Sequence, residues 1–138
     1  MLRLDHVAIQ VSDMQASIAF YTEKLGLRLM SHQVDQEHGE AFAFLELEGG
    51  NLELLQLLDD QGVPAPFTPP EITKPYCPHL AFGSDNLDKE LARLKQQGIP
   101  ILAGPLEIPG RVRWLYFCDP DNHVLEAIQW LSHAEADV

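Results

Sequence analysis

The sequence predicts an α+β fold built from two tandem copies of one β-α-β-β-β module. The first observation is a repeat: "LDHVAIQVSD" near the start is echoed by "CPHLAFGSDN", and His6 and His79 lie 73 residues apart (79 − 6). The second is that "LELLQ" is echoed by "LEAIQ", with Glu53 and Glu126 also 73 apart (126 − 53). The third is that both copies alternate strand-like and helix-like periodicity in the same order.

Length and composition fit one compact domain. The chain has 138 residues, of which 46% are hydrophobic, enough to bury a real core. With 22% charged residues and a mean hydropathy of −0.10, neither disorder nor a membrane protein is indicated. No apolar run approaches the roughly 20 residues of a membrane span, and no signal peptide is evident at the start.

Charge and cysteine content narrow the function classes. A net charge of −12 with only nine Lys and Arg excludes a nucleic-acid surface, which needs clustered cations. Cys77 and Cys118 are too few for a disulfide framework and too far apart for a CxxC motif. We therefore expect reduced thiols, a cytoplasmic location and a small-molecule partner rather than a membrane or a nucleic acid.

The first module, about residues 1–58, begins with a strand over 4–12. A helix follows, capped by Ser12 or Asp13, with Ile18, Tyr21 (or Phe20) and Leu25 as its apolar stripe and Gly26 as its stop. Strands are then predicted near 27–34, 40–47 and 51–58. Gly-Gly-Asn at 49–51 marks the turn between the last two.

The second module, about residues 77–130, repeats the order. A strand at 78–84 precedes a helix near 86–97, which has Leu87, Leu91 and Leu94 on one face and Gly98 after it. Strands follow near 99–103, 112–118 and 123–130, and "DPDN" turns the last hairpin. The linker, about 59–76, holds five of the ten prolines, and residues 131–138 form a C-terminal tail.

Both repeated glutamates interrupt apolar strands, where an isolated carboxylate is costly to bury. Side chains alternate along a strand, so each histidine shares a face with small or polar residues, while bulky residues occupy the opposite face. The small or polar residues on the histidine faces are Ala8, Gln10, Ala81 and Gly83. The bulky residues on the opposite faces are Val7, Ile9, Val11, Leu80 and Phe82. We expect the histidine faces to be concave and the bulky faces to pack against the helices.

Two histidines and two glutamates in matched register predict a metal site formed by His6, Glu53, His79 and Glu126. Modules packed about a pseudo-twofold axis would bring all four to one point. Each residue taken alone is more often a hydrogen-bonded strand histidine or an edge glutamate, and duplication copies such residues too. The shared register favours the metal, which would also compensate the buried carboxylates.

The sequence resembles the vicinal oxygen chelate superfamily, which includes glyoxalase I, methylmalonyl-CoA epimerase, extradiol dioxygenases and the fosfomycin and bleomycin resistance proteins. The resemblance rests on "LDHVAIQVSDMQASIAFYTEKLGL", "PHLAFGSDNLDKELARLKQQGI" and "FCDPDNHVLEAI" and covers the chain to about residue 130. It implies an open half-barrel mixed sheet. It also matches the glyoxalase I ligands one by one to His6, Glu53, His79 and Glu126.

Such a site suits one divalent ion, Ni, Zn, Co or Mn. As a Lewis acid the ion stabilises an enediolate, while Glu126 first and Glu53 second move a proton between adjacent carbons. The leading hypothesis is a lyase or isomerase of the glyoxalase I type, converting a 2-oxoaldehyde hemithioacetal into a 2-hydroxyacyl thioester. The resemblance also implies that dimers are common, so we expect a homodimer.

Four alternatives stay open. "EHGEAFAFLELEGGNLELLQLL" is similar to the epimerase branch, which acts on 2-methyl acyl-CoA, whereas "DPDN" resembles glyoxalases more. An extradiol dioxygenase would use Fe with His6, His79 and Glu126, and Glu53 as a fourth ligand argues against it. A fosfomycin-type thiol transferase normally uses three ligands. A non-catalytic resistance or binding protein would be expected to lack ligands.

Substrate contacts are predicted from "PGRVRW" and the strand that follows it. Arg111 and Arg113 could bind a carboxylate or thioester tail, against the alternative of a solvated loop. Trp114 and Tyr116, on one strand face, could line the pocket or pack in the core. Gln10 stands where the resemblance to glyoxalase I leads one to expect an arginine for glutathione.

Overall fold

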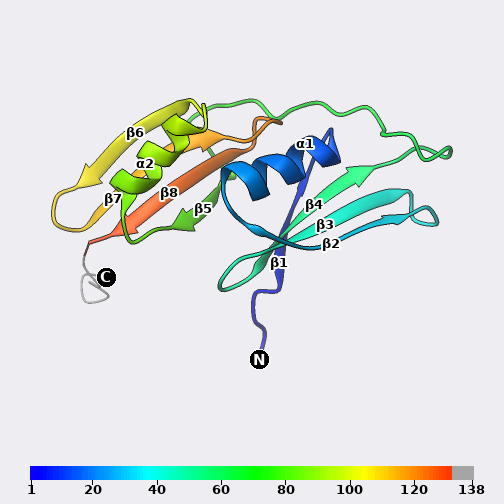
Figure 1. Ribbon diagram of the computed structural model, residues 1–138, viewed down its shortest axis with the longest axis horizontal. Helices are drawn as coiled ribbons and strands as arrows, with labels where there is room; N and C mark the ends of the chain where they lie inside the picture. Colours follow the sequence, from blue (N-terminus) through cyan, green and yellow to red (C-terminus); the bar gives the residue numbers. More distant parts are fainter. Residues whose placement is uncertain (132–138) are drawn as a thin grey trace. The chain divides into compact units, whose positions relative to one another are not determined.

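The computed structural model describes residues 1–131 and divides the chain into two compact units, Met1–Pro69 and a second that begins at Pro70. The first unit contains β1 (His6–Gln10), α1 (Met14–Ala19), η1 (Phe20–Lys24), β2 (Arg28–Asp35), β3 (Glu40–Glu46) and β4 (Asn51–Leu57). The second contains β5 (Leu80–Gly83), α2 (Leu87–Gln96), β6 (Ile101–Ile108), β7 (Val112–Cys118) and β8 (Val124–Trp130). Figure 1 labels these elements.

Each unit is built on one four-stranded sheet of the same topology. The strand order is β1-β4-β3-β2 in the first sheet and β5-β8-β7-β6 in the second. The first strand of each unit runs parallel to the last, and the other neighbours are antiparallel. The predicted α+β class with two β-α-β-β-β modules is confirmed.

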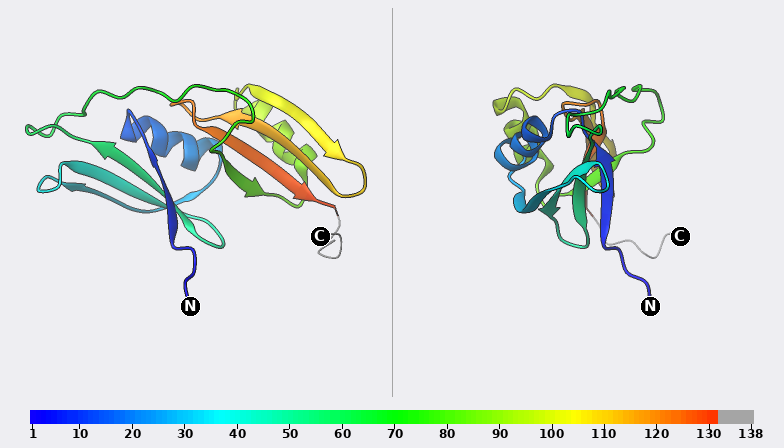
Figure 2. Two further views of the ribbon diagram at one scale, coloured as in Figure 1. Left: turned by 180° about the vertical axis from the view of Figure 1, so that it is seen from behind. Right: turned by 90° about the vertical axis from the view of Figure 1, so that its right-hand side faces the viewer.

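One face of each sheet is covered by a helix and carries the core. In the first unit the helix side is filled by residues such as Leu45 and Leu54, both fully buried. In the second unit Leu115 and Leu125 are buried in the same way. The two views of Figure 2 show α2 along one side of its sheet only. The other face of each sheet, which carries the histidine and glutamate, is left uncovered by the helix of its own unit.

The 73-residue repeat extends to the contacts that attach each helix to its sheet. Asp13 and Asn86 (86 − 13 = 73) cap α1 and α2 by accepting hydrogen bonds from the amides of Ala16 and Lys89. Near the far end of the last strand, the amide of Gln56 donates to the carbonyl of Ser12. The side-chain amide of Gln129 donates in the same way to the carbonyl of Asp85. Donor and acceptor are each shifted by the 73-residue repeat (129 − 56 = 73 and 85 − 12 = 73).

The first helix departs from the prediction of one continuous α-helix. It is α-helical only to Ala19 and continues as a π-helix over Phe20–Lys24. The wider π turn brings the adjacent Phe20 and Tyr21 both into the core, where they are 6% and 0% exposed. The sequence pattern left a choice between these two residues because an ideal α-helix rarely buries both.

The strand predicted at 99–103 is longer than the prediction, because β6 reaches Ile108. The added part of the strand contains Gly104 and Pro105. Since β6 is an edge strand, a proline without an N–H group is tolerated there, and the ladder shifts register around it. Gly104 has φ +98° and lies so close to β7 that a Cβ would stand 2.9 Å from the carbonyl oxygen of Trp114. The strand continues because this position is glycine.

No helix among residues 1–131 is both long and apolar enough to cross a membrane.

Candidate metal centre

In the first unit, His6 and Glu53 lie on adjacent strands of the uncovered face. His6 on β1 is offset from Glu53 on β4 by two residues of register, and His6 Nε2 lies 3.6 Å from Glu53 Oε1. The other ring nitrogen, Nδ1, is 2.7 Å from Asp5 Oδ2. This hydrogen bond, more than the charge of Glu53, raises the pKa of His6, while desolvation opposes it.

The second unit repeats the arrangement at closer range. His79 Nε2 lies 2.8 Å from Glu126 Oε1. His79 Nδ1 is 2.9 Å from the carbonyl oxygen of Tyr76, to which it donates because a carbonyl can only accept. The side chain of Glu126 is 8% exposed, so the carboxylate that interrupts this apolar strand is buried.

Both pairs place an imidazole Nε2 beside a carboxylate oxygen while Nδ1 is held by an acceptor. A neutral imidazole that donates from Nδ1 has a lone pair on Nε2. A lone pair and a carboxylate face each other favourably only with a proton or a cation between them. Two ligands adjacent on one octahedral ion at about 2.1 Å lie about 3 Å apart, close to both observed separations.

The donor set therefore fits a divalent metal in chemistry and spacing. Each unit offers one imidazole nitrogen and one carboxylate oxygen as possible ligands. The Nδ1 partners of the two histidines, the Asp5 carboxylate and the Tyr76 carbonyl, are the kinds of acceptor that orient a metal-bound histidine. Within residues 1–131, no group of three or more His, Cys, Asp or Glu side chains gathers at metal-binding distance.

An aromatic ring stands beside each pair, on the strand next to the glutamate. Phe44 lies opposite Glu53 and meets the His6 ring edge-on at 5.2 Å. Tyr116 lies opposite Glu126, with its ring 5.5 Å from that of His79. Burial, and secondarily the charge of Glu126, raises the pKa of the Tyr116 phenol, and a hydrogen bond with Trp114 lowers it.

The predicted substrate residues divide between the two faces of the second sheet. Trp114 and Tyr116 share the Glu126 face, because Trp114 pairs with Ile128 and Tyr116 with Glu126 in the β7–β8 ladder. Arg113 alternates to the helix face, where its guanidinium donates to Asp88 of α2 at 3.0 Å. Arg111 lies in the exposed turn between β6 and β7. Of the four predicted substrate residues, Trp114 and Tyr116 therefore share a sheet face with Glu126, and Arg111 and Arg113 do not.

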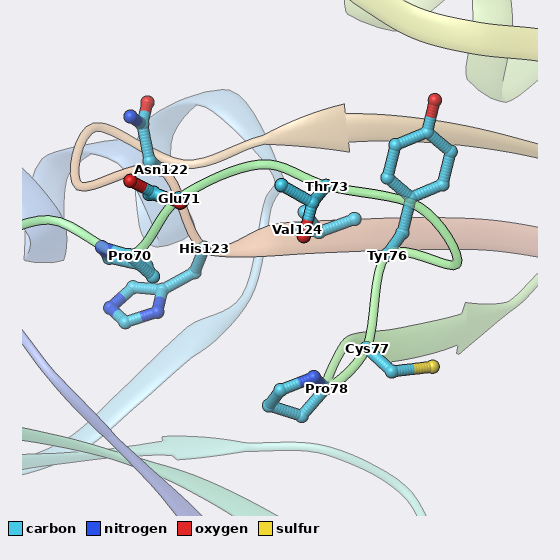
Figure 3. A pocket seen from close by; sticks show the side chains of 9 residues that line it. All are labelled: Pro70, Glu71, Thr73, Tyr76, Cys77, Pro78, Asn122, His123 and Val124. Carbon is cyan, nitrogen blue, oxygen red and sulfur yellow. The ribbon is translucent and has the colours of Figure 1, made fainter.

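Two cavities, one in each unit, have none of the four candidate ligands in their lining. A small one of about 80 Å³ lies between the segment 70–78 and the start of β8 (Figure 3). Its lining includes Tyr76 and Cys77, just before His79, and it holds little more than a few waters. A broader concavity in the first unit, about 530 Å³, is lined by Met14, Ala41 and Gln56 and so belongs to the helix side.

Sequence reasoning missed the residues that orient the two histidines. Asp5 directly precedes His6, and that adjacency was a usable signal. Tyr76 contributes a backbone carbonyl and has a left-handed φ of 64°, which no sequence pattern marks for a tyrosine. His38, which had no place in the repeat, pairs with Asp35 at 2.7 Å in the β2–β3 turn, while His133 lies outside the described residues.

Comparison with known proteins agrees with the fold. A model of the glyoxalase/bleomycin resistance protein/dioxygenase superfamily matches residues 3–127. The uncharacterized protein YwkD of Bacillus subtilis is 35% identical over 126 residues, covering 89% of this chain and 93% of its own.

Two further relatives differ in function. The lactoylglutathione lyase of Salmonella typhimurium is 30% identical, and the match covers 93% of each chain. The crystal structure of TnmS3, an antibiotic binding protein from Streptomyces, superposes with a TM-score of 0.70 over 94% of this chain and 97% of its own. At 23% identity, the second likeness is one of fold alone.

Proposed function

The chain belongs to the glyoxalase/bleomycin resistance protein/dioxygenase superfamily, and from that premise we propose that it is a divalent-metal-dependent lyase or isomerase of the glyoxalase I type. The observation that carries the proposal is the pair of imidazole–carboxylate contacts, His6–Glu53 at 3.6 Å and His79–Glu126 at 2.8 Å, which occur at equivalent sequence positions of the two units. These four residues would hold one Ni, Zn, Co or Mn ion.

The chemistry follows from what each residue can do. A divalent ion held by these residues would supply Lewis-acid chemistry for the substrate's oxygens. Glu126 takes the proton from the neighbouring carbon and returns it to the former carbonyl carbon, converting a 2-oxoaldehyde hemithioacetal into a 2-hydroxyacyl thioester. Glu126 is favoured over Glu53 because its side chain is the more buried of the two, 8% against 16% exposed, and its Oε1 lies closer to its histidine Nε2, at 2.8 Å against 3.6 Å.

Tyr116 supports this assignment by position. Its ring covers one side of His79 and lies opposite Glu126 on the neighbouring strand. It would limit the access of water to the carboxylate and hold the apolar part of a substrate. A phenol is neutral at pH 7, and burial raises the pKa of Tyr116 further, so it presents no competing charge.

The other members of the superfamily give the alternatives. Methylmalonyl-CoA-type epimerisation would use the same four ligands and the same proton transfer. An Fe(II) dioxygenase would require an open ligand set without Glu53, which instead faces His6. A binding protein would have no need for the two histidines to be oriented through Nδ1.

The remaining features of the proposal concern the whole protein. We expect a homodimer, measured by light scattering after size-exclusion chromatography. We also expect it to act in a reducing cytoplasm, since both Cys77 and Cys118 are free thiols.

The test is turnover by the metal-loaded protein. Protein stripped with EDTA and reloaded with each of the four metals is mixed with methylglyoxal and either glutathione or 2-mercaptoethanol, and thioester formation is followed. We expect metal-dependent turnover that Glu126→Gln reduces at least about 100-fold. Glu107→Gln, a strand glutamate on the helix side of the second sheet, is the matched control and should retain activity.

Metal content is measured on the same samples, so loss of the ion is separated from loss of the base. No thioester with any metal or thiol would contradict the proposed reaction. Cleavage of a catechol ring by the iron-loaded protein would favour the dioxygenase instead.

A further inference from the structure

The face of the second sheet that carries His79 and Glu126 is an apolar surface. Beside the Tyr116–Glu126 pair stands the pair Trp114–Ile128. Beyond it lie three large, exposed apolar side chains: Leu106 is 43% exposed, Ile108 50% and Trp130 64%. The ladder pairs place all of them on one face: Leu106 with Trp114, and Ile108 with Val112, which pairs in turn with Trp130.

This surface is continuous with the candidate ligands. Along β7, Trp114 follows Tyr116 on the same face, and Tyr116 meets both His79 and Glu126. Aromatic and branched side chains exposed together beside polar, convergent groups are typical of ligand sites. We name Leu106, Ile108, Trp114, Ile128 and Trp130 the apolar face.

The cations on the helix and strands of the second unit belong to the opposite side of its sheet. Lys89, Arg93 and Lys95 belong to α2 or its last turn, on the helix side of the sheet. Arg113 faces the same side and is paired with Asp88. Lys74 and Arg111 lie in the segments before β5 and between β6 and β7. Among the described residues, the sheet positions that share the face of Glu126 include neither lysine nor arginine.

The corresponding face of the first unit is similar. Phe42, Phe44 and Leu55 share the face of Glu53 in the β3–β4 ladder. The positively charged side chain on this sheet face is Arg28 of β2, and it forms an ion pair with Glu46. The chain as a whole carries a net charge of −12, which repels anions at long range.

From these observations we infer that the substrate is an uncharged molecule with an aromatic or branched apolar body and two adjacent oxygens, not a group carried on an anionic thiol such as glutathione or coenzyme A. Carboxylates and phosphates are recognised by arginine and lysine, and among the described sheet positions of the two faces the one such residue is Arg28, which is paired with Glu46. This inference rests on the proposed function, because the two oxygens require the metal site. It assigns the apolar face to the substrate's body.

The experiment uses the zinc-loaded protein and two chelating probes with the same hydroxamate head. Acetohydroxamic acid carries a methyl group and benzohydroxamic acid a phenyl ring, so the ratio of their dissociation constants, from calorimetry, reports the contribution of the ring, and the change of this ratio in variants assigns that contribution to the apolar face. We expect benzohydroxamic acid to bind at least about 10-fold more tightly. Excess S-methylglutathione or coenzyme A should not compete.

Variants locate the effect. Leu106→Ala and Trp114→Ala should each reduce the ratio of dissociation constants while leaving acetohydroxamic acid bound, and the exposed Leu106 gives a variant that folds even where Trp114→Ala does not. Glu107→Ala, which neighbours Leu106 but points to the helix side, is the matched control and should keep the wild-type ratio.

The outcomes separate this inference from the proposed function. Equal affinity for the two probes, or competition by S-methylglutathione or coenzyme A, overturns the inference and leaves the metal enzyme standing. A ratio that falls as protein concentration rises also overturns it, because the apolar face is then an interface between copies of the chain. Failure of both hydroxamates to bind overturns the metal site, and the inference with it.

Discussion

At the scale of single residues, the orientation of the two histidines is the feature most relevant to function. In both units Nδ1 is held by an acceptor, the Asp5 carboxylate or the Tyr76 carbonyl, and Nε2 faces a glutamate. That choice of tautomer leaves on Nε2 the lone pair that a metal requires. The two units use different acceptors for the same purpose.

Removal of the Asp5 carboxylate should weaken metal binding. Asp5→Ala deletes the acceptor that fixes Nδ1–H on His6, so we expect the affinity for Zn or Co to fall about 10- to 100-fold. Calorimetry measures the affinity, and nitrogen NMR of the His6 ring reports the tautomer directly. Asp5→Asn keeps an acceptor without the charge and should restore most of the tautomer preference.

The control for this prediction is Glu37→Gln, which removes an exposed carboxylate from the turn between β2 and β3. It should leave metal affinity unchanged. Equal affinities for wild type and Asp5→Ala would show that Asp5 is a surface residue without influence on the site.

The sequence predicts the four candidate ligands because duplication preserved both their type and their spacing. The partners of the imidazoles are harder to predict. The Tyr76 carbonyl reaches His79 through a left-handed backbone, which depends on the path of the chain rather than on the side chain. Arg113 was predicted to contact substrate from its place next to the turn at 109–111. It belongs to β7, where the alternation of side chains directs it toward Asp88 on the helix side.

At the scale of elements, two glutamine side chains link the last strand of each unit to the start of its helix. Gln129 accepts a hydrogen bond from the amide of Leu87, the first residue of α2, and donates to the carbonyl of Asp85. Gln56 donates to the carbonyl of Ser12 in the first unit and is 8% exposed. These contacts hold the helix against the strand that carries the candidate ligand three residues earlier.

Replacement of Gln129 should destabilise the second unit. Gln129→Ala removes two hydrogen bonds and leaves the amide at the start of α2 without its acceptor, which should lower the free energy of unfolding by about 1–2 kcal/mol. Urea unfolding measures this change. Gln96→Ala, at an exposed position on the same helix, should change the unfolding free energy by no more than about 0.5 kcal/mol. Equal effects of the two variants would refute the linking role.

Element boundaries show where sequence patterns stop being informative. The span of β7 is as predicted, since alternation runs through it without interruption. β6 and the first helix were mispredicted because the deciding factors are tertiary. An edge position accommodates Pro105, and a π turn accommodates both Phe20 and Tyr21. Local propensity gives no account of either.

At the scale of the whole molecule, the structure is one module used twice, and the proposed site is divided between the copies. In the proposed site each unit would supply one nitrogen and one oxygen ligand, so a four-ligand ion would require both units. A metal shared by the two units would therefore also stabilise the fold, because it binds only when both are folded.

The most direct test of this account is the metal content of the purified protein and of two single variants, measured by mass spectrometry after reloading and desalting. The account predicts one Ni, Zn, Co or Mn ion per chain in the wild type, and its loss from both His6→Ala and His79→Ala, although the two residues belong to different units. An ion retained by either variant, or no ion bound by the wild type, would contradict a single metal centre shared by the two repeats.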